Sequence, residues 1–212
     1  MRYFPISIDT KDKKILVAGG GRAAFIKLKS LVCTMASIEA ISAEFCDDIL
    51  NLQKNYPNKL FLKTITIIAD SIDFEEDYSM VFICTDNKEL NEKLTIHFKL
   101  KNVPVMAADD RENSDFITSS VLERENITIA VNTEGRSPTA SKMILKEAEK
   151  VLTEELIKKV DLLSLIRQML IEEKNKSNDE NLIGPVMEKL SQLSCGDLEK
   201  KLKELNDIGR MK

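Results

Sequence analysis

Short apolar runs alternate with amphipathic stretches along the first half of the chain. We expect strands at the runs rich in apolar and β-branched residues, which are 15–18, 37–42, 60–68, 79–84 and 103–108. Helical spacing of apolar residues follows several of these runs, at 22–34, 47–54 and 88–101. The continuous run at 79–84 is typical of a parallel strand buried on both faces. This alternation predicts an α/β fold with a doubly wound parallel sheet.

The pattern changes after residue 112. Two further strands are expected at 115–122 and 127–132, and a helix should begin at Ser137, where a capping hydroxyl precedes a proline, and end near residue 151. Helical periodicity resumes at residue 153, with a polar linker at 174–181 and short helices at 185–193 and 197–206. We therefore divide the chain into a sheet domain (1–112), a β/helix segment (113–152) and a small helical C-terminal domain (153–212). An edge segment is expected at 1–12, and the acidic stretch 70–77 is interpreted as a solvated connection.

Three consecutive glycines separate the first predicted strand from the first predicted helix. Gly19, Gly20 and Gly21, with Ala24 three residues later, match the G-x-G-x-x-G/A fingerprint of a Rossmann-type dinucleotide site. The first glycine allows a tight turn, the second lets the backbone approach a pyrophosphate, and the small Ala24 allows the helix to pack against the strand. The start of the helix favours an anion. We interpret the turn as a nucleotide site, although such glycines also occur for packing alone.

The end of the second predicted strand is where a Rossmann-type protein contacts the adenine ribose. Ser42 stands at the strand tip and Glu44 is the first acid after it. An acid in this region binds the 2′-hydroxyl of NAD, whereas a nearby arginine accommodates the 2′-phosphate of NADP. Neither arginine nor lysine follows Ser42 directly, so we expect NAD.

Polar residues follow the fourth and fifth predicted strands, at the sheet edge where ligands bind in open α/β sheets. Thr85 and Asp86 follow the fourth strand, and Asp109 and Asp110 follow the fifth. A carboxylate placed there can accept a proton during oxidation of a bound substrate. An acidic pair after a strand is also typical of a solvated turn.

Composition and charge exclude several classes of protein. The net charge of −4 gives no basic field for a nucleic-acid partner. The apolar runs are far shorter than the ~20 residues of a membrane span, and no signal-peptide core follows Met1, so we expect a cytoplasmic protein without a membrane partner. Four cysteines without a C-x-x-C pair, and His97 as the single histidine, do not predict a zinc site. Cys33 and Cys84 are expected to be small buried apolar residues.

Several motifs occur in an order that carries a family resemblance. They are Gly19–Gly21 with Ala24, Thr85–Asp86 with Asn91, Ala107–Asp110, Asp115–Ile117 with Ser120, and Gly135–Pro138 at a helix start. Over about residues 1 to 150 the chain resembles the precorrin-2 dehydrogenases of sirohaem synthesis, which also form the N-terminal part of multifunctional sirohaem synthases. It departs from that pattern at Met106, where many members have asparagine, and at Ser119, where proline is common.

The resemblance implies an activity and a set of site residues. Members of this family oxidise precorrin-2 to sirohydrochlorin with NAD, and some also insert ferrous iron. They are homodimers in which the central β/helix segment is exchanged or packed between subunits. Asp109 matches the family's catalytic aspartate, with Asp110 as the alternative. The implied cofactor contacts come from the glycine turn, the turn after the second strand and the end of the fourth strand. They are Gly19, Gly20, Gly21, Arg22, Ala23, Ser42, Ala43, Glu44, Thr85 and Asp86.

The implied tetrapyrrole substrate, precorrin-2 or its product sirohydrochlorin, carries eight carboxylates, so cationic groups and helix starts should bind it. Arg136 beside the Ser137 helix start is the candidate carboxylate clamp, and Ser120 is a candidate hydroxyl donor. Arg136 is equally interpretable as a surface arginine.

Two other functions remain open. A non-catalytic NAD-sensing regulatory module also begins with such a glycine turn, but usually has an acid in the place of Ser42 and does not account for the helix start at Ser137. A tetrapyrrole chaperone would bind the substrate without depending on NAD. Turnover separates an enzyme from both.

Overall fold

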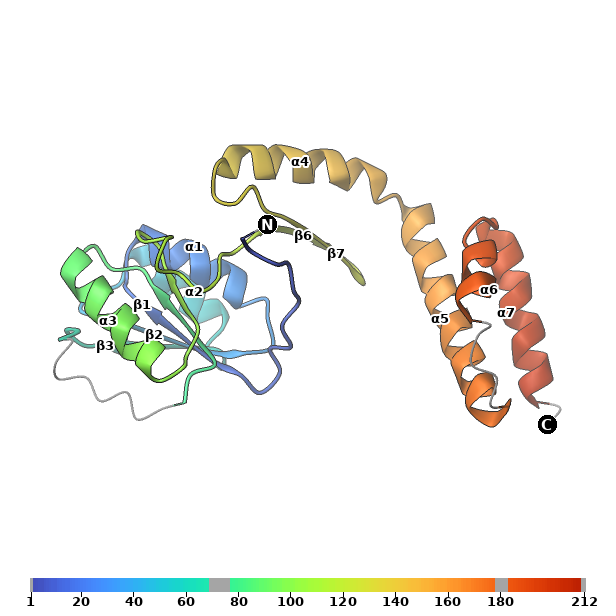
Figure 1. Ribbon diagram of the computed structural model, residues 1–212, viewed down its shortest axis with the longest axis horizontal. Coiled ribbons are helices and arrows are strands. Elements are labelled where there is room, and N and C mark those ends of the chain that lie inside the picture. Colours follow the sequence, from blue (N-terminus) through green and yellow to red (C-terminus); the bar gives the residue numbers. More distant parts are fainter. Residues whose placement is uncertain (1, 69–76, 178–182, 211–212) are drawn as a thin grey trace. The chain divides into compact units, whose positions relative to one another are not determined.

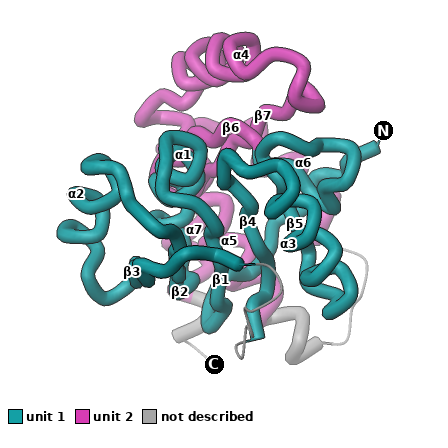
Figure 2. Tube along the Cα trace, turned by 90° about the vertical axis from the view of Figure 1, so that its left-hand side faces the viewer, with its two compact units in different colours: residues 1–118 teal, residues 119–212 magenta. Residues whose placement is uncertain are grey.

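A computed structural model describes residues 2–68, 77–177 and 183–210. The chain forms two compact units, Met1–Thr118 and Ser119–Lys212 (Figure 2). Each unit has its own hydrophobic core, and each is described separately below. The division of the second unit at residue 152 stays a prediction. Most of the acidic connection at 70–77 and half of the polar linker at 174–181 lie outside the described residues.

The first unit is built on a five-stranded parallel sheet with the order β3-β2-β1-β4-β5. Its strands are β1 (Lys14–Ala18), β2 (Ser37–Ser42), β3 (Leu60–Thr64), β4 (Met80–Ile83) and β5 (Val105–Ala107). The central strands read as continuous apolar runs because both faces of the sheet are covered, and all four residues of β4 are buried. The predicted α/β parallel sheet is confirmed.

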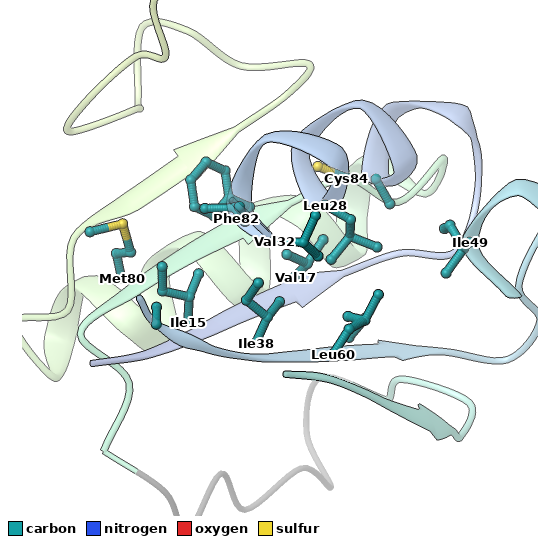
Figure 3. Close-up of a cluster of buried hydrophobic side chains, with 14 of the residues drawn as sticks. Ile15, Val17, Leu28, Val32, Ile38, Ile49, Leu60, Met80, Phe82 and Cys84 are labelled. Atoms are coloured by element: carbon teal, nitrogen blue, oxygen red, sulfur yellow. The ribbon is translucent and has the colours of Figure 1, made fainter. Parts of the chain in front are cut away.

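Helices cover both faces of this sheet (Figure 1). They are α1 (Arg22–Leu31), α2 (Asp47–Asn55) and α3 (Lys88–Leu100). Side chains from α1 and α2, such as Leu28 and Ile49, join one core cluster with Val17 and Phe82 (Figure 3). Leu94 and Phe98 of α3 join the cluster on the opposite face. The sheet is therefore the middle layer of three.

The strand order creates a switch point at the centre of the sheet. The chain runs outward from β1 through β2 to β3, and then returns to place β4 on the other side of β1. The connections that leave β1 and β4 therefore diverge to opposite sides, and ligands of open α/β sheets bind at the carboxyl ends of the strands at such a point. The glycine turn follows β1, and Thr85 and Asp86 follow β4. The candidate residues of the first unit are thus gathered at the edge where such folds bind ligands.

The edge next to β5 differs from expectation, because residues 115–119 do not form a strand. Asp115 pairs with Val105 in place of a strand. Its Oδ2 accepts a hydrogen bond from the Val105 amide over 2.9 Å, and its own amide donates to the Val105 oxygen over 2.8 Å. Phe116 then packs edge-on against Phe82, with ring centroids 5.3 Å apart. The Ala107 amide also donates to the Ser114 hydroxyl over 3.0 Å, so side chains take the place of a strand along β5.

Two other expectations about unit 1 were wrong. The N-terminal segment forms no strand between residues 2 and 12, and its Phe4 and Ile6 side chains are 80% and 68% exposed. The start of this N-terminal segment contacts the turn after β5, where Arg2 forms a 2.7 Å ion pair with Glu112. Cys33 is exposed, whereas Cys84 is buried as expected.

A buried acid connects three neighbouring strands of the sheet, β1, β2 and β3. Glu39 on β2 is only 4% exposed, and it accepts hydrogen bonds from the Tyr78 hydroxyl over 2.8 Å and from Lys63 over 2.9 Å. Lys14 lies 3.5 Å away. Burial alone would raise the pKa of Glu39, but the two hydrogen bonds and the neighbouring ammonium charges bring it below the ordinary value. The ionised carboxylate is therefore the form that the fold stabilises.

The second unit begins with an antiparallel hairpin, β6 (Ser120–Arg124) and β7 (Ile127–Val131), followed by α4 (Pro138–Val151). The Ser137 hydroxyl accepts a hydrogen bond from the Ala140 amide over 3.1 Å, which confirms the predicted helix start. Helix α4 packs on both strands, yet Ser141 is its one fully buried residue. A hairpin under a single helix thus leaves much of its apolar surface uncovered.

Three helices complete the second unit: α5 (Glu154–Ser177), α6 (Ile183–Leu190) and α7 (Cys195–Arg210). Their core is a cluster of leucine and isoleucine side chains centred on Ile166 and Leu198, both fully buried. Helix α5 continues to Ser177, so residues 174–177, which were expected in the linker, are helical. No described helix has both the length and the apolarity needed to cross a bilayer.

Candidate functional site

Two of the three glycines are required by the protein's own packing. Gly19 has a φ of +127°, which L side chains rarely adopt, and a Cβ atom there would lie 2.4 Å from the backbone oxygen of Cys84. A Cβ atom on Gly20 would lie 1.8 Å from the backbone oxygen of Glu44. These two glycines let β1 end in close contact with the loops that follow β4 and β2.

Gly21 is different, because the fold does not require a glycine there. Its φ of −96° and ψ of −163° are open to any residue, and a Cβ atom would meet nothing within 4 Å. Gly21 is the N-cap of α1, yet no side chain caps this helix and no acid stands in its first turn. The first amides of α1 therefore have no side-chain cap, and with the positive end of the helix dipole they suit an anion. The residues present fit the pyrophosphate of a dinucleotide.

The loop after β2 lies directly against the glycine turn. Besides the Glu44 contact, the Cys46 amide donates to the Gly20 oxygen over 2.9 Å. Ala43 and Glu44 are exposed, and Ser42 is half-buried. Arg22, which opens α1, is engaged in a 3.2 Å ion pair with Asp48 and lies over the Phe25 ring. The structure therefore places the candidate cofactor contacts that follow β1 and β2 next to one another, on one surface.

Candidates from the β4 and β5 ends are joined by a buried asparagine. Asn91 on α3 is 3% exposed, and its amide nitrogen donates to the Thr85 oxygen over 3.1 Å and to Oδ2 of Asp109 over 3.0 Å. The Thr85 hydroxyl donates in turn to the Asn91 side-chain oxygen. Asn87 caps α3 by accepting from the Leu90 amide, which fixes the helix that carries Asn91. The Asp109 carboxylate is therefore held by a buried partner, although Asp109 itself is exposed.

The two adjacent acids have different surroundings. Asp110 accepts from both nitrogens of Asn113, over 3.1 Å to the backbone amide and 2.6 Å to the side chain. These hydrogen bonds lower the pKa of Asp110. Within the described parts of the chain, Asn91 is the one hydrogen-bond donor to Asp109 and it occupies Oδ2, which leaves Oδ1 for a ligand. The geometry thus favours Asp109 as the reactive acid and makes Asp110 part of the turn.

A lysine that the sequence patterns did not single out lies beside this edge. Lys27 of α1 is half-buried, and its Nζ donates to the Thr118 hydroxyl over 2.7 Å. Burial lowers the pKa of Lys27, and the buried Cys84 thiol is close enough to counter part of that effect. The pKa of Cys84 is raised to about 11, mainly by burial. The charge of Lys27 lowers this pKa in part, and the charge of Asp109 raises it further. The sequence gave no sign that Lys27 is half-buried, because lysines at similar positions of a helix commonly cover its solvent-exposed surface.

The remaining candidates belong to the second unit and are described within it. Ser120 opens β6, where it pairs with Val131. The Arg136 side chain is 81% exposed and has a loose contact of 3.4 Å with Glu134. Ser137 uses its hydroxyl to cap α4. The exposed guanidinium is available to an anion, and the Ser137 hydroxyl accepts from the Ala140 amide while its own hydrogen stays available to a ligand.

Among the described residues, no three histidine, cysteine or acidic side chains come together as a possible metal site. The first unit itself offers one anchored carboxylate, Asp109, at the same sheet edge as a turn shaped for an anion. A carboxylate at this edge can accept a proton from a substrate whose electrons pass to a neighbouring dinucleotide.

Comparison with known proteins finds siroheme synthases among the relatives of this chain. The chain is 29% identical over 198 residues to a siroheme synthase of Vesicomyosocius okutanii, covering 90% of this chain and 41% of that protein. It is also 29% identical over 152 residues to the siroheme synthase of Ruthia magnifica, covering 72% of this chain and 31% of that one. The chain thus spans about two fifths of the length of the first relative and less of the second. The resemblance found in the sequence motifs is confirmed.

A solved structure and a family model complete the comparison. The solved structure of "SirC, precorrin-2 dehydrogenase" matches with a TM-score of 0.69 at 16% identity, covering 95% of this chain and 99% of that one, which shows the same fold. Residues 6–120 match the family model described as "Putative NAD(P)-binding", and this range contains the glycine turn, Lys27 and Asp109. The chain therefore belongs to this NAD(P)-binding family.

Proposed function

We propose that the protein is an NAD-dependent precorrin-2 dehydrogenase that forms sirohydrochlorin in sirohaem synthesis. The observation that carries the proposal is the Asp109 carboxylate, anchored by buried Asn91 at the same sheet edge as the glycine turn. The similarity to siroheme synthases and to the precorrin-2 dehydrogenase SirC supports it. A purely NAD-sensing module has no need for an anchored acid at this position.

The cofactor would be held by the first unit. The amides of Arg22 and Ala23 at the uncapped start of α1 would bind the pyrophosphate, and the open space at Gly21 lets it approach. The exposed loop of Ala43 and Glu44 would face the adenine ribose. Because Arg22 is already paired with Asp48, it is less available to a 2′-phosphate, which supports NAD rather than NADP. When bound, NAD supplies the hydride acceptor.

Asp109 would accept the proton that leaves the macrocycle when the hydride is transferred. Asn91 holds Oδ2, so Oδ1 receives the proton, and the exposed position of Asp109 lets the proton pass on to solvent. Thr85 helps indirectly, because its hydrogen bond with Asn91 fixes the orientation of the asparagine amide. In the second unit, Arg136 would bind a substrate carboxylate through its exposed guanidinium.

We also propose that the protein functions as a homodimer. The hairpin and its covering helix leave apolar side chains exposed, and exposed apolar surface of this kind marks an interaction site. Val121 on β6 and Met143 on α4 are 58% and 63% exposed, and Val151 at the end of α4 is 65% exposed. The same segment of a second chain is the partner that the family resemblance implies, and it would cover these side chains.

Ferrous iron insertion is the finer part of the proposal. Insertion of iron into sirohydrochlorin releases two pyrrole N–H protons, and Asp109 is the acid placed to accept them. An assay with sirohydrochlorin and ferrous iron but no NAD tests this separately. A rate equal to the reaction without protein would limit the enzyme to dehydrogenation.

The main test is anaerobic incubation with enzymatically prepared precorrin-2 and NAD. We expect NADH and sirohydrochlorin to appear together, in equal amounts and at a rate proportional to enzyme. NAD binding without turnover would indicate the regulatory module instead. Tetrapyrrole binding that is unaffected by NAD, again without turnover, would indicate a chaperone.

A further inference from the structure

Lys27 stands out in the first unit because it is a half-buried cation whose described partner is a neutral hydroxyl. Within the part of the chain that the structure describes, Nζ makes one hydrogen bond, to the Thr118 hydroxyl at 2.7 Å, and forms no ion pair. An ammonium group has three donors, so two remain for a ligand. Burying a charge is unfavourable unless it is paired. The stability of the fold alone does not explain why this lysine is held half-buried, which suggests that it binds a ligand.

The position of Lys27 points to the candidate active site. Side chains on a helix lean toward its N-terminus, which directs Lys27 back toward the glycine turn and the carboxyl end of the sheet. Cys84, the residue directly after β4, lies close enough to interact electrostatically with both Lys27 and Asp109. Lys27 reaches this strand end from the α1 side, whereas Asp109 is anchored by α3 on the opposite side. The two charged groups therefore flank one strand end.

The support of Lys27 is built from the edge of the sheet. Phe116 packs on Phe82 of β4, and Asp115 pairs with Val105 of β5. These contacts fix the segment that places Thr118 beside Nζ. The ammonium is thus held at a defined point by Thr118, whereas Lys29 of the same helix is exposed.

We propose that the Lys27 ammonium binds a carboxylate of the tetrapyrrole substrate beside the carboxyl end of β4, with Thr118 positioning it. The inference rests on the dehydrogenase function proposed above and adds a substrate-binding residue to it. A macrocycle with eight carboxylates offers such a group on every side, so one contact beside β4 can orient the ring relative to Asp109. Lys27 does not take part in the proton transfer.

The test compares Lys27→Met, Lys27→Arg and the matched control Lys29→Met in full-length protein. Methionine keeps the length and apolar stem of the side chain and removes the charge. We expect Lys27→Met to raise the KM for precorrin-2 about 10-fold or more, the effect of losing one charge-assisted hydrogen bond, with a much smaller change in kcat. Lys27→Arg should recover most of the loss. NAD affinity should be unchanged in all three variants, and Lys29→Met should behave as wild type.

Ionic strength gives a second readout that a merely structural role would not change. The KM of the wild type should rise with salt, and that dependence should be weaker in Lys27→Met. A KM equal to that of the wild type in Lys27→Met would overturn the inference while leaving the dehydrogenase function intact. If the wild type does not turn over precorrin-2, binding of uroporphyrin, a stable octacarboxylate tetrapyrrole, decides. Weaker binding by Lys27→Met supports the inference, whereas equal binding or none by the wild type overturns it.

Discussion

The side-chain amide of Asn91 donates to Oδ2 of Asp109 over 3.0 Å, and its second hydrogen is directed to the Thr85 oxygen over 3.1 Å. One buried amide thus connects the carboxyl ends of β4 and β5. Because both of its donors and its oxygen are used, Asn91 can adopt only one orientation. The carboxylate that we propose as the proton acceptor is positioned by this group.

Replacing Asn91 by alanine should therefore lower kcat more than it changes KM. We expect a fall of about 10-fold or more in kcat, together with a loss of about 1–3 kcal/mol in the free energy of unfolding, because the part-buried Thr85 oxygen loses its partner. Steady-state kinetics and urea unfolding measure the two effects. Asn113→Ala is the matched control, since Asn113 bonds to Asp110. Equal kinetics in both variants would contradict the positioning role.

The two neighbouring acids should separate on substitution. Asp109→Asn should lose about 100-fold or more in dehydrogenation rate while binding NAD with unchanged affinity. Asp110→Asn should keep the activity, because Asp110 only closes a turn with Asn113. Single-turnover NADH formation and NAD titration decide between them. The reverse result would assign the proton transfer to Asp110.

The glycines also predict different outcomes. Gly20→Ala should destabilise the fold by at least about 3 kcal/mol, since its Cβ would overlap the Glu44 oxygen. Gly21→Ala should leave the unfolding free energy near that of the wild type, because its Cβ meets no protein atom, yet raise the Kd for NAD about 10-fold or more. Thermal unfolding and NAD titration test this pair. Unimpaired NAD binding by Gly21→Ala would show that the space at this turn is not used by the cofactor.

Low pH should reduce the free energy of unfolding through protonation of Glu39. Its pKa is lowered in the fold, so its stabilisation is complete above the ordinary value of 4.5 and is lost as the pH falls below it toward the folded value. Glu39→Gln should cost about 2 kcal/mol at neutral pH and flatten this acid limb. Urea unfolding at several pH values measures both. Glu89→Gln, at a 78% exposed side chain on α3, should change neither.

The exposed apolar side chains of unit 2 predict the oligomeric state. Charged substitutions Val121→Asp and Met143→Glu should shift a dimer to monomer in sedimentation experiments, and activity should fall in parallel. Leu100→Glu, at an equally apolar but 80% exposed position of unit 1, is the control. A wild type that sediments as a monomer at micromolar concentration would contradict the proposed dimer.

Most of the sheet could be predicted because buried parallel strands are apolar along their whole length, as at 80–83. The single-residue pairing between Asp115 and Val105 could not, since one side chain that replaces a strand leaves no periodic signal. Asn91 was part of a sequence motif, but its link to Asp109 depends on how α3 packs on the sheet. Lys27 gave no signal at all, because only its burial distinguishes it from surface lysines such as Lys29.

The hydrogen bond from the Cys46 amide to the Gly20 oxygen, together with the contact between Gly20 and Glu44, has a thermodynamic consequence. The turn that would receive the pyrophosphate and the loop that would receive the adenine ribose are locked together before any ligand arrives. Little conformational entropy is then lost in this part of the site on binding, so the affinity that the contacts provide is retained. The first unit is in this sense preorganised to receive a dinucleotide.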